Sequence, residues 1–460
     1  MSKSDRGRRF ATEVVGTLQG AGFRALWAGG CVRDLMLGLN PADYDVATDA
    51  TPEQVIALFG RRTVPVGVSF GVVRVLGPHA SGIEVEVATF RSDGVYVDGR
   101  RPESVTFSSL ELDAARRDFT INGMFLDPFT DEVIDHVGGR ADLRDRILRA
   151  IGDPAARFRE DKLRLLRAVR FAARFEMAME PGTRSALRAM AGQVVQVAAE
   201  RIAQELRKML VDEHRATAMQ LALDEGLTPA ILPPVASMRG VAHGCPVQPD
   251  GDLWDHSLRA LRHLPTKTSF PLAFAALLHD VGEPETLTIE EGLARFPDHE
   301  QAGRRIADGL CRQLKLSNQE RERITWLVGS HHALDGATTL RDSQRKRLLA
   351  RPGVDELLAL CRADALACTG DTRQVDYCEA YLRDQPAGPI DPPPLVTGDD
   401  LVSHGLRPGA HFARLLDQVR DAQLDGVVIG RSEALAWLDR LLASEGTPGS
   451  GHGGGSDSER

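Results

Sequence analysis

The stretch that decides the fold spans residues 29–45 and reads GGCVRDLMLGLNPADYD. It begins with Gly29 and Gly30, where a short apolar run gives way to a helical pattern. A glycine pair at such a junction lets backbone N–H groups approach a phosphate closely, and Arg33 would add positive charge. The pattern predicts a cradle for a triphosphate, although a glycine pair also occurs in ordinary turns.

Two acidic residues, Asp43 and Asp45, end the same stretch with one residue between them. In a β-strand, side chains two apart project from one face, so these carboxylates would point together. Adjacent carboxylates repel each other unless a cation lies between them, and Mg²⁺ prefers oxygen ligands. A turn is the alternative interpretation, because residues 40–43 read NPAD, which is typical of turns.

From residue 10 to residue 90 the sequence alternates helical patches with short strand-like runs, which indicates an α/β domain. The strand-like runs are residues 26–32, 44–47, 72–76 and 83–90. In the last run, IEVEVA alternates strictly and puts Glu84 and Glu86 on one strand face. A solvent-facing edge strand would show the same alternation.

Four motifs together resemble the head of the bacterial tRNA nucleotidyltransferase family, which is related to the poly(A) polymerases. They are GGCVRDLMLG at 29–38, DYD at 43–45, EVATFR at 86–91 and RRDFTING at 116–123. The resemblance implies a nucleotidyltransferase head of the polymerase-β-like type, a small mixed sheet with helices. It also implies that Asp43 and Asp45 hold two Mg²⁺ ions, with Glu86 as the supporting third acid. Such a site activates the tRNA 3′-hydroxyl for attack on the α-phosphorus of CTP or ATP.

The resemblance also assigns contacts to the incoming nucleotide. Gly29, Gly30 and Arg33 would form the cradle, and Arg116, Arg117, Asp118 and Asn122 would contact the triphosphate and ribose. Arginine suits this role because its planar fork binds phosphate oxygens in pairs. A surface salt bridge between the two arginines and Asp118 is the alternative interpretation.

A basic helical segment follows, in which residues 157–164 read RFREDKLR and Arg167, Arg170 and Arg174 continue at helical spacing. It matches the Glu-Asp-x-x-Arg element that reads the incoming base in the resembling family. We expect Asp161 and Arg164, three apart, to lie side by side on one helical face. A carboxylate accepts from the amino group of C or A while an arginine donates to the ring nitrogen, and G and U present the opposite pattern. A plain ion pair on a solvated helix face is the alternative.

Residues 96–102, YVDGRRP, carry the Asp-Gly signal of a hairpin. In the resembling family this stretch is a mobile loop that helps the switch from C to A addition. Its presence favours complete CCA synthesis over addition of only A, only C or a poly(A) tail.

The middle of the chain concentrates histidine and aspartate in an order that resembles the HD-domain phosphohydrolases. That resemblance implies one ion held by His256, His279, Asp280 and Asp364, and a second held by His299 with His331. Imidazole and carboxylate ligands suit transition metals as well as Mg²⁺ or Mn²⁺, so the identity of this divalent metal stays open. A structural metal, or none, is the alternative to a hydrolytic centre.

Breaks in composition divide the chain into parts. A Pro- and Gly-containing linker at 228–251 and a Pro-rich segment at 385–395 separate helical blocks. We expect an α/β head at 1–140, then an all-α remainder with a neck at 141–227 that reads the nucleotide and binds tRNA, an HD domain at 252–384, a tail at 395–444 and a disordered end at 445–460. The neck run AERIAQEL at 199–206 resembles a structural helix of the family, and the tail resembles its tRNA-binding part.

The overall composition restricts how the chain could bind a nucleic acid and where it would occur in the cell. The net charge of -9 and the aromatic share of 5% argue against uniform coating of a nucleic acid and against a stacking platform, so tRNA would be held by local charge and shape. The six scattered cysteines fit a reducing cytoplasm, and no apolar run is long enough for a membrane span. Together with this composition, the family resemblance implies a cytoplasmic enzyme that adds C and A nucleotides from CTP and ATP to tRNA. An HD phosphohydrolase whose head only binds RNA is the alternative of another class.

Overall fold

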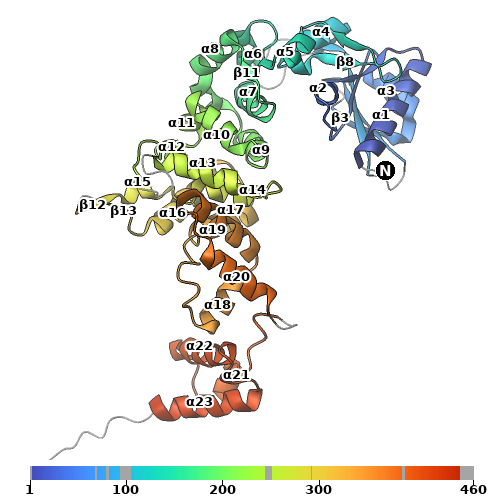
Figure 1. Cartoon of the computed structure of the whole chain (residues 1–460). Coiled ribbons are helices and arrows are strands. Elements are labelled where there is room, and N and C mark those ends of the chain that lie inside the picture. The colour runs from blue at the N-terminus through green and yellow to red at the C-terminus, as the bar shows by residue number, and fades with distance from the viewer. Residues whose placement is uncertain are drawn as a thin grey trace, which may run out of the picture.

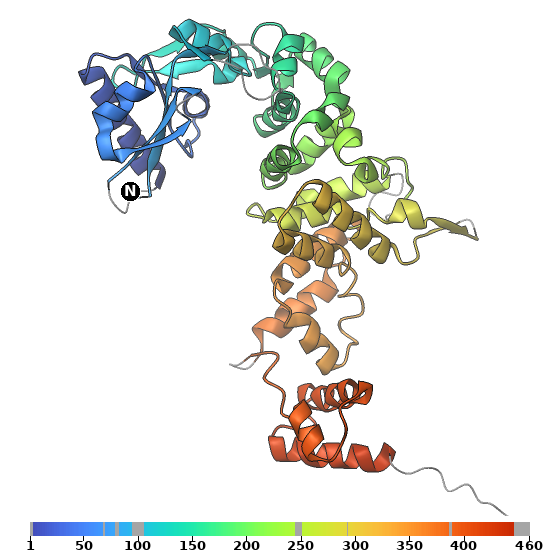
Figure 2. The same cartoon turned by 180° about the vertical axis from the view of Figure 1, so that it is seen from behind.

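The computed structural model describes residues 3–67, 70–78, 82–93, 105–243, 251–291, 293–385 and 389–445. The described chain is elongated and hooked, with the head at one end curling round beside the neck and the helical domains following in chain order (Figures 1 and 2). The predicted loop at 96–102 and nearly all of the predicted disordered end lie outside the described residues.

The head contains a seven-stranded mixed sheet in the order β3-β4-β5-β2-β1-β8-β9. Its strands are β1 (Ala25–Ala28), β2 (Asp45–Thr48), β3 (Thr63–Gly67), β4 (Val72–Leu76), β5 (Glu84–Thr89), β8 (Met124–Leu126) and β9 (Val133–Asp135). Helices α1 (Lys3–Gly20) and α3 (Pro52–Phe59) cover one face, and α4 (Leu110–Ala115) packs on the other. The predicted α/β head with a small mixed sheet is confirmed.

The register of the sheet places two of the predicted acids next to each other. Strands β2 and β5 run parallel, with Val46 opposite Val87. One residue earlier along each strand stand Asp45 and Glu86, on the same face because side-chain direction alternates along both strands. The predicted strand at 26–32 is too long, because Gly29 has a φ of 73° and α2 (Gly30–Met36) begins directly after it.

The neck contains seven α-helices in the described part of the chain. They are α6 (Pro154–Glu160), α7 (Leu163–Arg174), α8 (Pro181–Met190), α9 (Ala199–Leu210), α10 (Arg215–Asp224), α11 (Leu227–Ile231) and α12 (Pro233–Ala236). A short parallel pair, β10 (Ile147–Leu148) with β11 (Ala178–Met179), also lies in this supposedly all-helical part. The predicted linker at 228–251 is partly wrong, since α12 and most of α11 fall within it.

The predicted continuous helix across 157–164 is also wrong. Helix α6 ends at Glu160, and Asp161 has extended backbone angles. The Asp161 carboxylate accepts a hydrogen bond from the Leu163 N–H at the start of α7 (3.1 Å). Aspartate favours this role because its side chain satisfies a backbone donor that has no partner within the helix.

The HD region and the tail are helical apart from one hairpin. The HD region comprises α13 (Leu253–His263), α14 (Phe270–Leu278), α15 (Glu283–Thr286), the hairpin β12 (Thr288–Glu290) and β13 (Leu293–Arg295), α16 (His299–Gln313), α17 (Asn318–Val328), α18 (Asp342–Leu349), α19 (Val354–Cys368) and α20 (Arg373–Arg383). The tail, at the far end in Figure 1, comprises α21 (Gly398–Ser403), α22 (Ala410–Leu424) and α23 (Arg431–Glu445). One apolar core runs from head to HD region, and the tail has its own. None of the helices in the described part of the chain is long and apolar enough to cross a membrane.

A close backbone approach in the HD region depends on Gly282. A Cβ atom on this residue would lie 2.2 Å from the His299 carbonyl oxygen and 2.5 Å from the Gly303 nitrogen. Both are backbone atoms of α16, so the contact cannot be relieved by a rotamer change. The approach sets the spacing between Asp280 and His299.

We expect Gly282→Ala to lower the thermal stability of the HD region, because α15 and α16 must separate. Overpacking of this kind costs roughly 1–3 kcal/mol. Gly309→Ala on α16 is the matched control, since an added Cβ meets nothing within 4 Å there and Ala favours the helix. Differential scanning calorimetry checks the pair, and equal transitions for Gly282→Ala and wild type would contradict the close-packing argument.

Candidate functional site

A cavity of about 760 Å³ opens between the head and the neck. Every predicted nucleotide-binding residue lines it, together with both predicted metal-binding aspartates. They are Gly29, Gly30, Arg33, Asp43, Asp45, Arg116, Arg117, Asp118, Asn122, Asp161, Arg164, Arg167 and Arg170. Residues far apart in the sequence thus meet in one basic space with an acidic floor.

The acidic floor consists of Asp43 and Asp45 at the start of β2. Partial desolvation on the cavity floor and then the negative charges of Asp43 and Glu86 raise the pKa of Asp45 to about 7, although part of its side chain reaches solvent. Such a pKa indicates carboxylates that repel each other, which is the condition a bound cation relieves. The donor set therefore fits a divalent cation.

The third predicted acid, Glu86, is not part of the lining of the cavity. Its carboxylate lies 3.7 Å from Arg74 on the neighbouring strand β4, and its side chain is about half exposed. Among the described residues that line the cavity, Glu86 is absent. It lies on the same sheet face as Asp45 and contributes negative charge near that residue.

The predicted cradle relies on the backbone of Gly29. The residue lies in the left-handed region, and a Cβ there would come within 2.7 Å of Arg117 Nη1. Arg117 in turn donates to the Asn122 carbonyl (3.3 Å) and pairs with Asp113 (3.0 Å). Because glycine has no Cβ, the Arg117 side chain can pack against this position and form part of the cavity wall.

A hydrogen-bonded chain connects the head side of the cavity to the neck side. Arg33 donates to Asn122 Oδ1 (2.6 Å), and Asn122 donates to Asp118 Oδ1 (2.9 Å). Arg167 of α7 donates to the other oxygen of Asp118 (2.6 Å). Burial alone would raise the pKa of Asp118, but Arg167 and Asn122 hold it well below its ordinary value.

Two aromatic rings of α7 and its end support the basic wall. The Arg33 guanidinium lies 4.4 Å from the centre of the Phe175 ring, and Arg170 lies 4.2 Å from that of Phe171. The two rings stack at 5.9 Å. These cation–π contacts hold several guanidinium groups close together despite their mutual repulsion.

The predicted base readers line the same cavity but do not form the expected pair. Arg164 pairs with Glu160 (2.6 Å), while Asp161 pairs with Arg201 of α9 (2.8 Å). Sequence reasoning treated the α9 segment as merely structural and missed this arginine. The signal was present, because Arg201 and Glu205 are four apart and so share one helix face, and Glu205 accepts from Arg170 (2.6 Å).

All six predicted HD ligands converge in the HD region. They come from α13, the end of α14, the start of α16, the turn after α17, and α19. In the first group, His256 Nε2 lies 3.1 Å from Asp364 Oδ1 and 2.9 Å from His279 Nε2. The ligand atoms of these three residues all lie within 4.8 Å of one another.

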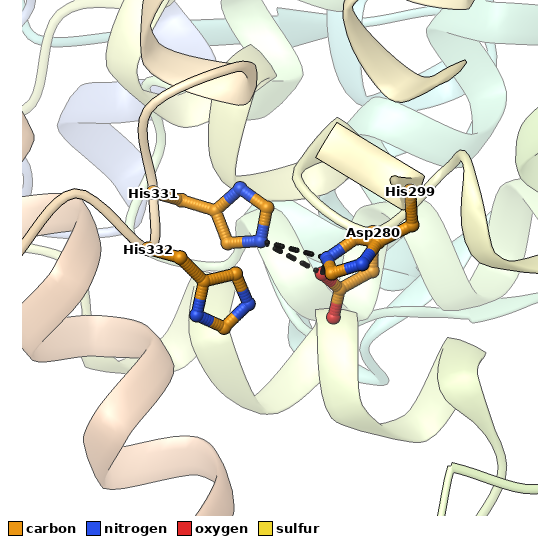
Figure 3. Close-up of side chains that lie close together, drawn as sticks. All are labelled: Asp280, His299, His331 and His332. Atoms are coloured by element: carbon orange, nitrogen blue, oxygen red, sulfur yellow. Dashed lines mark hydrogen bonds and ion pairs between the residues drawn. The ribbon is translucent and has the colours of Figure 1, made fainter. Parts of the chain in front are cut away.

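The second group shares Asp280 with the first. Its Oδ1 lies 3.2 Å from His331 Nε2, which is 3.3 Å from His299 Nε2 (Figure 3). Its Oδ2 lies 3.1 Å from His279 Nε2 in the first group. The two oxygens of one carboxylate thus face two clusters of histidines.

Backbone carbonyls fix the orientation of three of these histidines. His279 Nδ1 donates to the Ala276 carbonyl (2.9 Å), and His331 Nδ1 donates to the Val328 carbonyl (2.7 Å). His299 makes the same contact with the carbonyl three residues earlier (3.0 Å). Since Nδ1 carries the proton, each Nε2 presents a lone pair toward the carboxylates, which is the donor pattern of a metal site.

Three further residues at this centre escaped the sequence reasoning. His332 joins the second group, and His243 lies 3.1 Å from Glu283, whose carboxylate groups with Asp280. Burial and then the charge of Asp280 raise the pKa of Glu283 to about 9. The His-His doublet at 331–332 was a signal, and Glu283 follows Asp280 by a single turn, but His243 reaches the centre only through tertiary packing.

Comparison with known domain families agrees with this organisation. The family described as "Poly A polymerase head domain" matches residues 25–149, and "Probable RNA and SrmB- binding site of polymerase A" matches 176–238. The HD domain family matches 253–368. Fold and site together define a nucleotidyltransferase head joined to a helical HD-containing body.

Individual relatives show which enzymes the chain resembles in sequence. A CCA-adding enzyme of Geobacillus stearothermophilus is 43% identical over 227 residues, which is 49% of this chain and 55% of that protein. One of Limosilactobacillus fermentum is 41% identical over 47% of this chain and 53% of its own length. The chain thus spans about half the length of the curated relatives it matches.

Solved structures extend the likeness over nearly the whole chain. The Bacillus stearothermophilus CCA-adding enzyme in complex with CTP has a TM-score of 0.72 and 27% identity, covering 97% of this chain and 99% of that one. A Thermotoga maritima CCA-adding enzyme complexed with tRNA shares the fold, at 19% identity and a TM-score of 0.60 over 94% of this chain and 95% of that one. The head of the chain thus matches the poly(A) polymerase head family, and the chain as a whole is similar in fold to CCA-adding enzymes.

Proposed function

We propose that this chain adds C and A nucleotides from CTP and ATP to the 3′ end of tRNA without a template. The observation that carries the proposal is the single cavity in which Asp43 and Asp45 of the head face the basic residues of the neck. Matched CCA-adding enzymes, including one solved with CTP and others with ATP or tRNA, support it.

Asp43 and Asp45 would hold two Mg²⁺ ions in the head, with Glu86 adding negative charge nearby. When bound, the ions would supply charge neutralisation of the triphosphate and activation of the 3′-hydroxyl. Arg33, Arg116 and Arg117 would bind the phosphate oxygens from the other side of the cavity. Their pairing with Asp34 and Asp113 keeps the guanidinium groups in place before the nucleotide arrives.

Asp161 and Arg164 would read the base from fixed positions. Arg201 holds the Asp161 carboxylate, while Glu160 and the Arg157 carbonyl hold Arg164. A carboxylate retains lone pairs for an incoming amino group even when one arginine is bound to it. Because both side chains are supported, a base that presents the wrong donors and acceptors leaves buried polar groups unpaired, at roughly 1–3 kcal/mol each.

A second candidate function is hydrolysis of a phosphate ester at the HD centre. Asp280 contacts both ligand groups, and members of each group line a cavity of about 390 Å³. Divalent cations bound there would supply Lewis-acid activation of the ester, and imidazole with carboxylate suits transition metals such as Mn²⁺ or Ni²⁺. The described lining contains no lysine or arginine, so a substrate with one phosphate group suits it better than a triphosphate.

We also place the protein in the cytoplasm, where its proposed tRNA and nucleotide substrates occur. Support comes from Cys31, Cys311, Cys361, Cys368 and Cys378, none of which forms a disulfide.

Replacing either floor carboxylate should abolish nucleotide addition while tRNA still binds. Asp43→Asn or Asp45→Asn removes charge from the cation site but leaves the basic neck intact. We expect single-turnover CTP incorporation to fall by roughly a thousandfold or more, since several kcal/mol of stabilisation are lost. Asp49→Asn, an exposed acid just beyond β2, is the matched control. Addition at near wild-type rate in the Asp43 or Asp45 variants would remove the two-metal assignment.

Removing Arg164 should damage base choice more than chemistry. In Arg164→Ala the donor that opposes the ring N–H of U is gone, so kcat/KM for CTP over UTP should fall by roughly tenfold or more. Arg159→Ala is the matched control, because Arg159 lies on α6 with its side chain 64% exposed. The measurement is single-nucleotide addition with all four nucleotides on a tRNA lacking CCA. A uniform slowdown with unchanged ratios would mean that Arg164 only pairs with Glu160.

The HD centre should work independently of the head. We expect His279→Ala to abolish metal-dependent hydrolysis of p-nitrophenyl phosphate, bis-p-nitrophenyl phosphate or 2′,3′-cyclic AMP and to leave CTP incorporation unchanged. His263→Ala, an exposed residue at the end of α13, is the control that should retain both activities. Absence of hydrolysis by the wild-type chain with Mg²⁺, Mn²⁺, Ni²⁺ and Zn²⁺ would reject the catalytic assignment.

A further inference from the structure

His256 differs from the other histidines of the HD centre in the surroundings of its second ring nitrogen. Its side chain is fully buried and its Nε2 faces Asp364 and His279. Its Nδ1 is buried but makes no hydrogen bond, whereas Nδ1 of His279, His299 and His331 each meets a backbone carbonyl. A buried polar atom without a partner needs a physical explanation.

Two side chains that can bind metal lie beside His256. The ligand atoms of His243, His256 and Cys368 all lie within 4.8 Å of one another. The His243 ring sits 4.3 Å from the His256 ring, and Cys368 lies one helical turn beyond Asp364 on α19, so both project from the same side of that helix. His243 and Cys368 also line the cavity of the HD centre.

We propose that His243, His256 and Cys368 form a further cation site beside the HD centre, suited to Zn²⁺. Two imidazoles and a thiolate are the soft, mixed donor set that zinc favours over Mg²⁺ or Mn²⁺. His256 would contribute Nδ1, while its Nε2 keeps the ring proton and donates it to the Asp364 carboxylate (3.1 Å), so that His256 serves either this site or the HD centre at one time. On binding, the thiol of Cys368 gives its proton to solvent, and the fourth position of the ion stays open toward the cavity.

The site shares His256 with the first HD ligand group and no residue with the second. Within the described residues, no group of ligand atoms at this spacing contains both Cys368 and Asp364, or both Cys368 and Asp280. The inference goes beyond the proposed function, because it requires neither nucleotide addition nor hydrolysis. It predicts a sulfur ligand in a region where the other donors are nitrogen and oxygen.

Cobalt substitution tests the proposal directly, because a Co²⁺–thiolate bond gives a near-ultraviolet charge-transfer band that nitrogen and oxygen ligands do not give. We expect the full-length chain titrated with Co²⁺ to show this band, and Zn²⁺ to abolish it by displacement. Cys368→Ser should lose the band, and His243→Ala should lose it as well. Cys378→Ser is the matched control, a buried cysteine on α20 that should keep the band.

Thermal unfolding of each variant separates loss of the ligand from loss of the fold, and serine preserves the shape of the side chain. Absence of the band in the wild-type chain would overturn the proposal. Persistence of the band in Cys368→Ser would also overturn it, because the sulfur ligand would then be another cysteine.

Discussion

An ion pair between the part-buried Arg167 of the neck and the buried Asp118 of the head joins the two halves of the nucleotide cavity. Asp118 continues through Asn122 to Arg33, so the pair ties the base-reading helix to the cradle. Removing one partner would leave a buried charge uncompensated, at roughly 3–5 kcal/mol. Together with the hydrogen bonds from Arg157 and Arg164 to the Arg116 carbonyl, this contact helps to fix the distance between the acids of the head and the base readers of the neck.

The HD centre follows a different rule, in which carboxylate oxygens and imidazole lone pairs converge and leave room for a cation. Asp280 stands between two histidine clusters, and carbonyl groups of the backbone hold three of the rings. The close approach of α15 and α16 at Gly282 keeps His299 within reach of that carboxylate. Head, neck and HD region share one apolar core, so both sites rest on a common scaffold, although they use separate ligands.

Periodicity in the sequence predicted which side chains share a face, and it failed where partner choice depends on tertiary packing. The alternation around Asp45 and Glu86 gave the correct strand faces, yet Arg74 draws the Glu86 carboxylate toward β4. The helical spacing of Asp161 and Arg164 was misleading, because the backbone is extended at Asp161, between α6 and α7. Arg201 and His243 enter their sites from distant segments, a relation that no local pattern encodes.

The most direct test of the central account is the length of the products made on a tRNA that ends before CCA. The account predicts two added nucleotides with CTP alone and three with CTP and ATP together. The reason is that one cavity accepts only C or A, and the growing 3′ end limits how many nucleotides are added. It predicts no efficient extension with ATP alone. A long ladder with ATP alone, or a stop after two nucleotides when both are present, would contradict complete CCA addition by this chain.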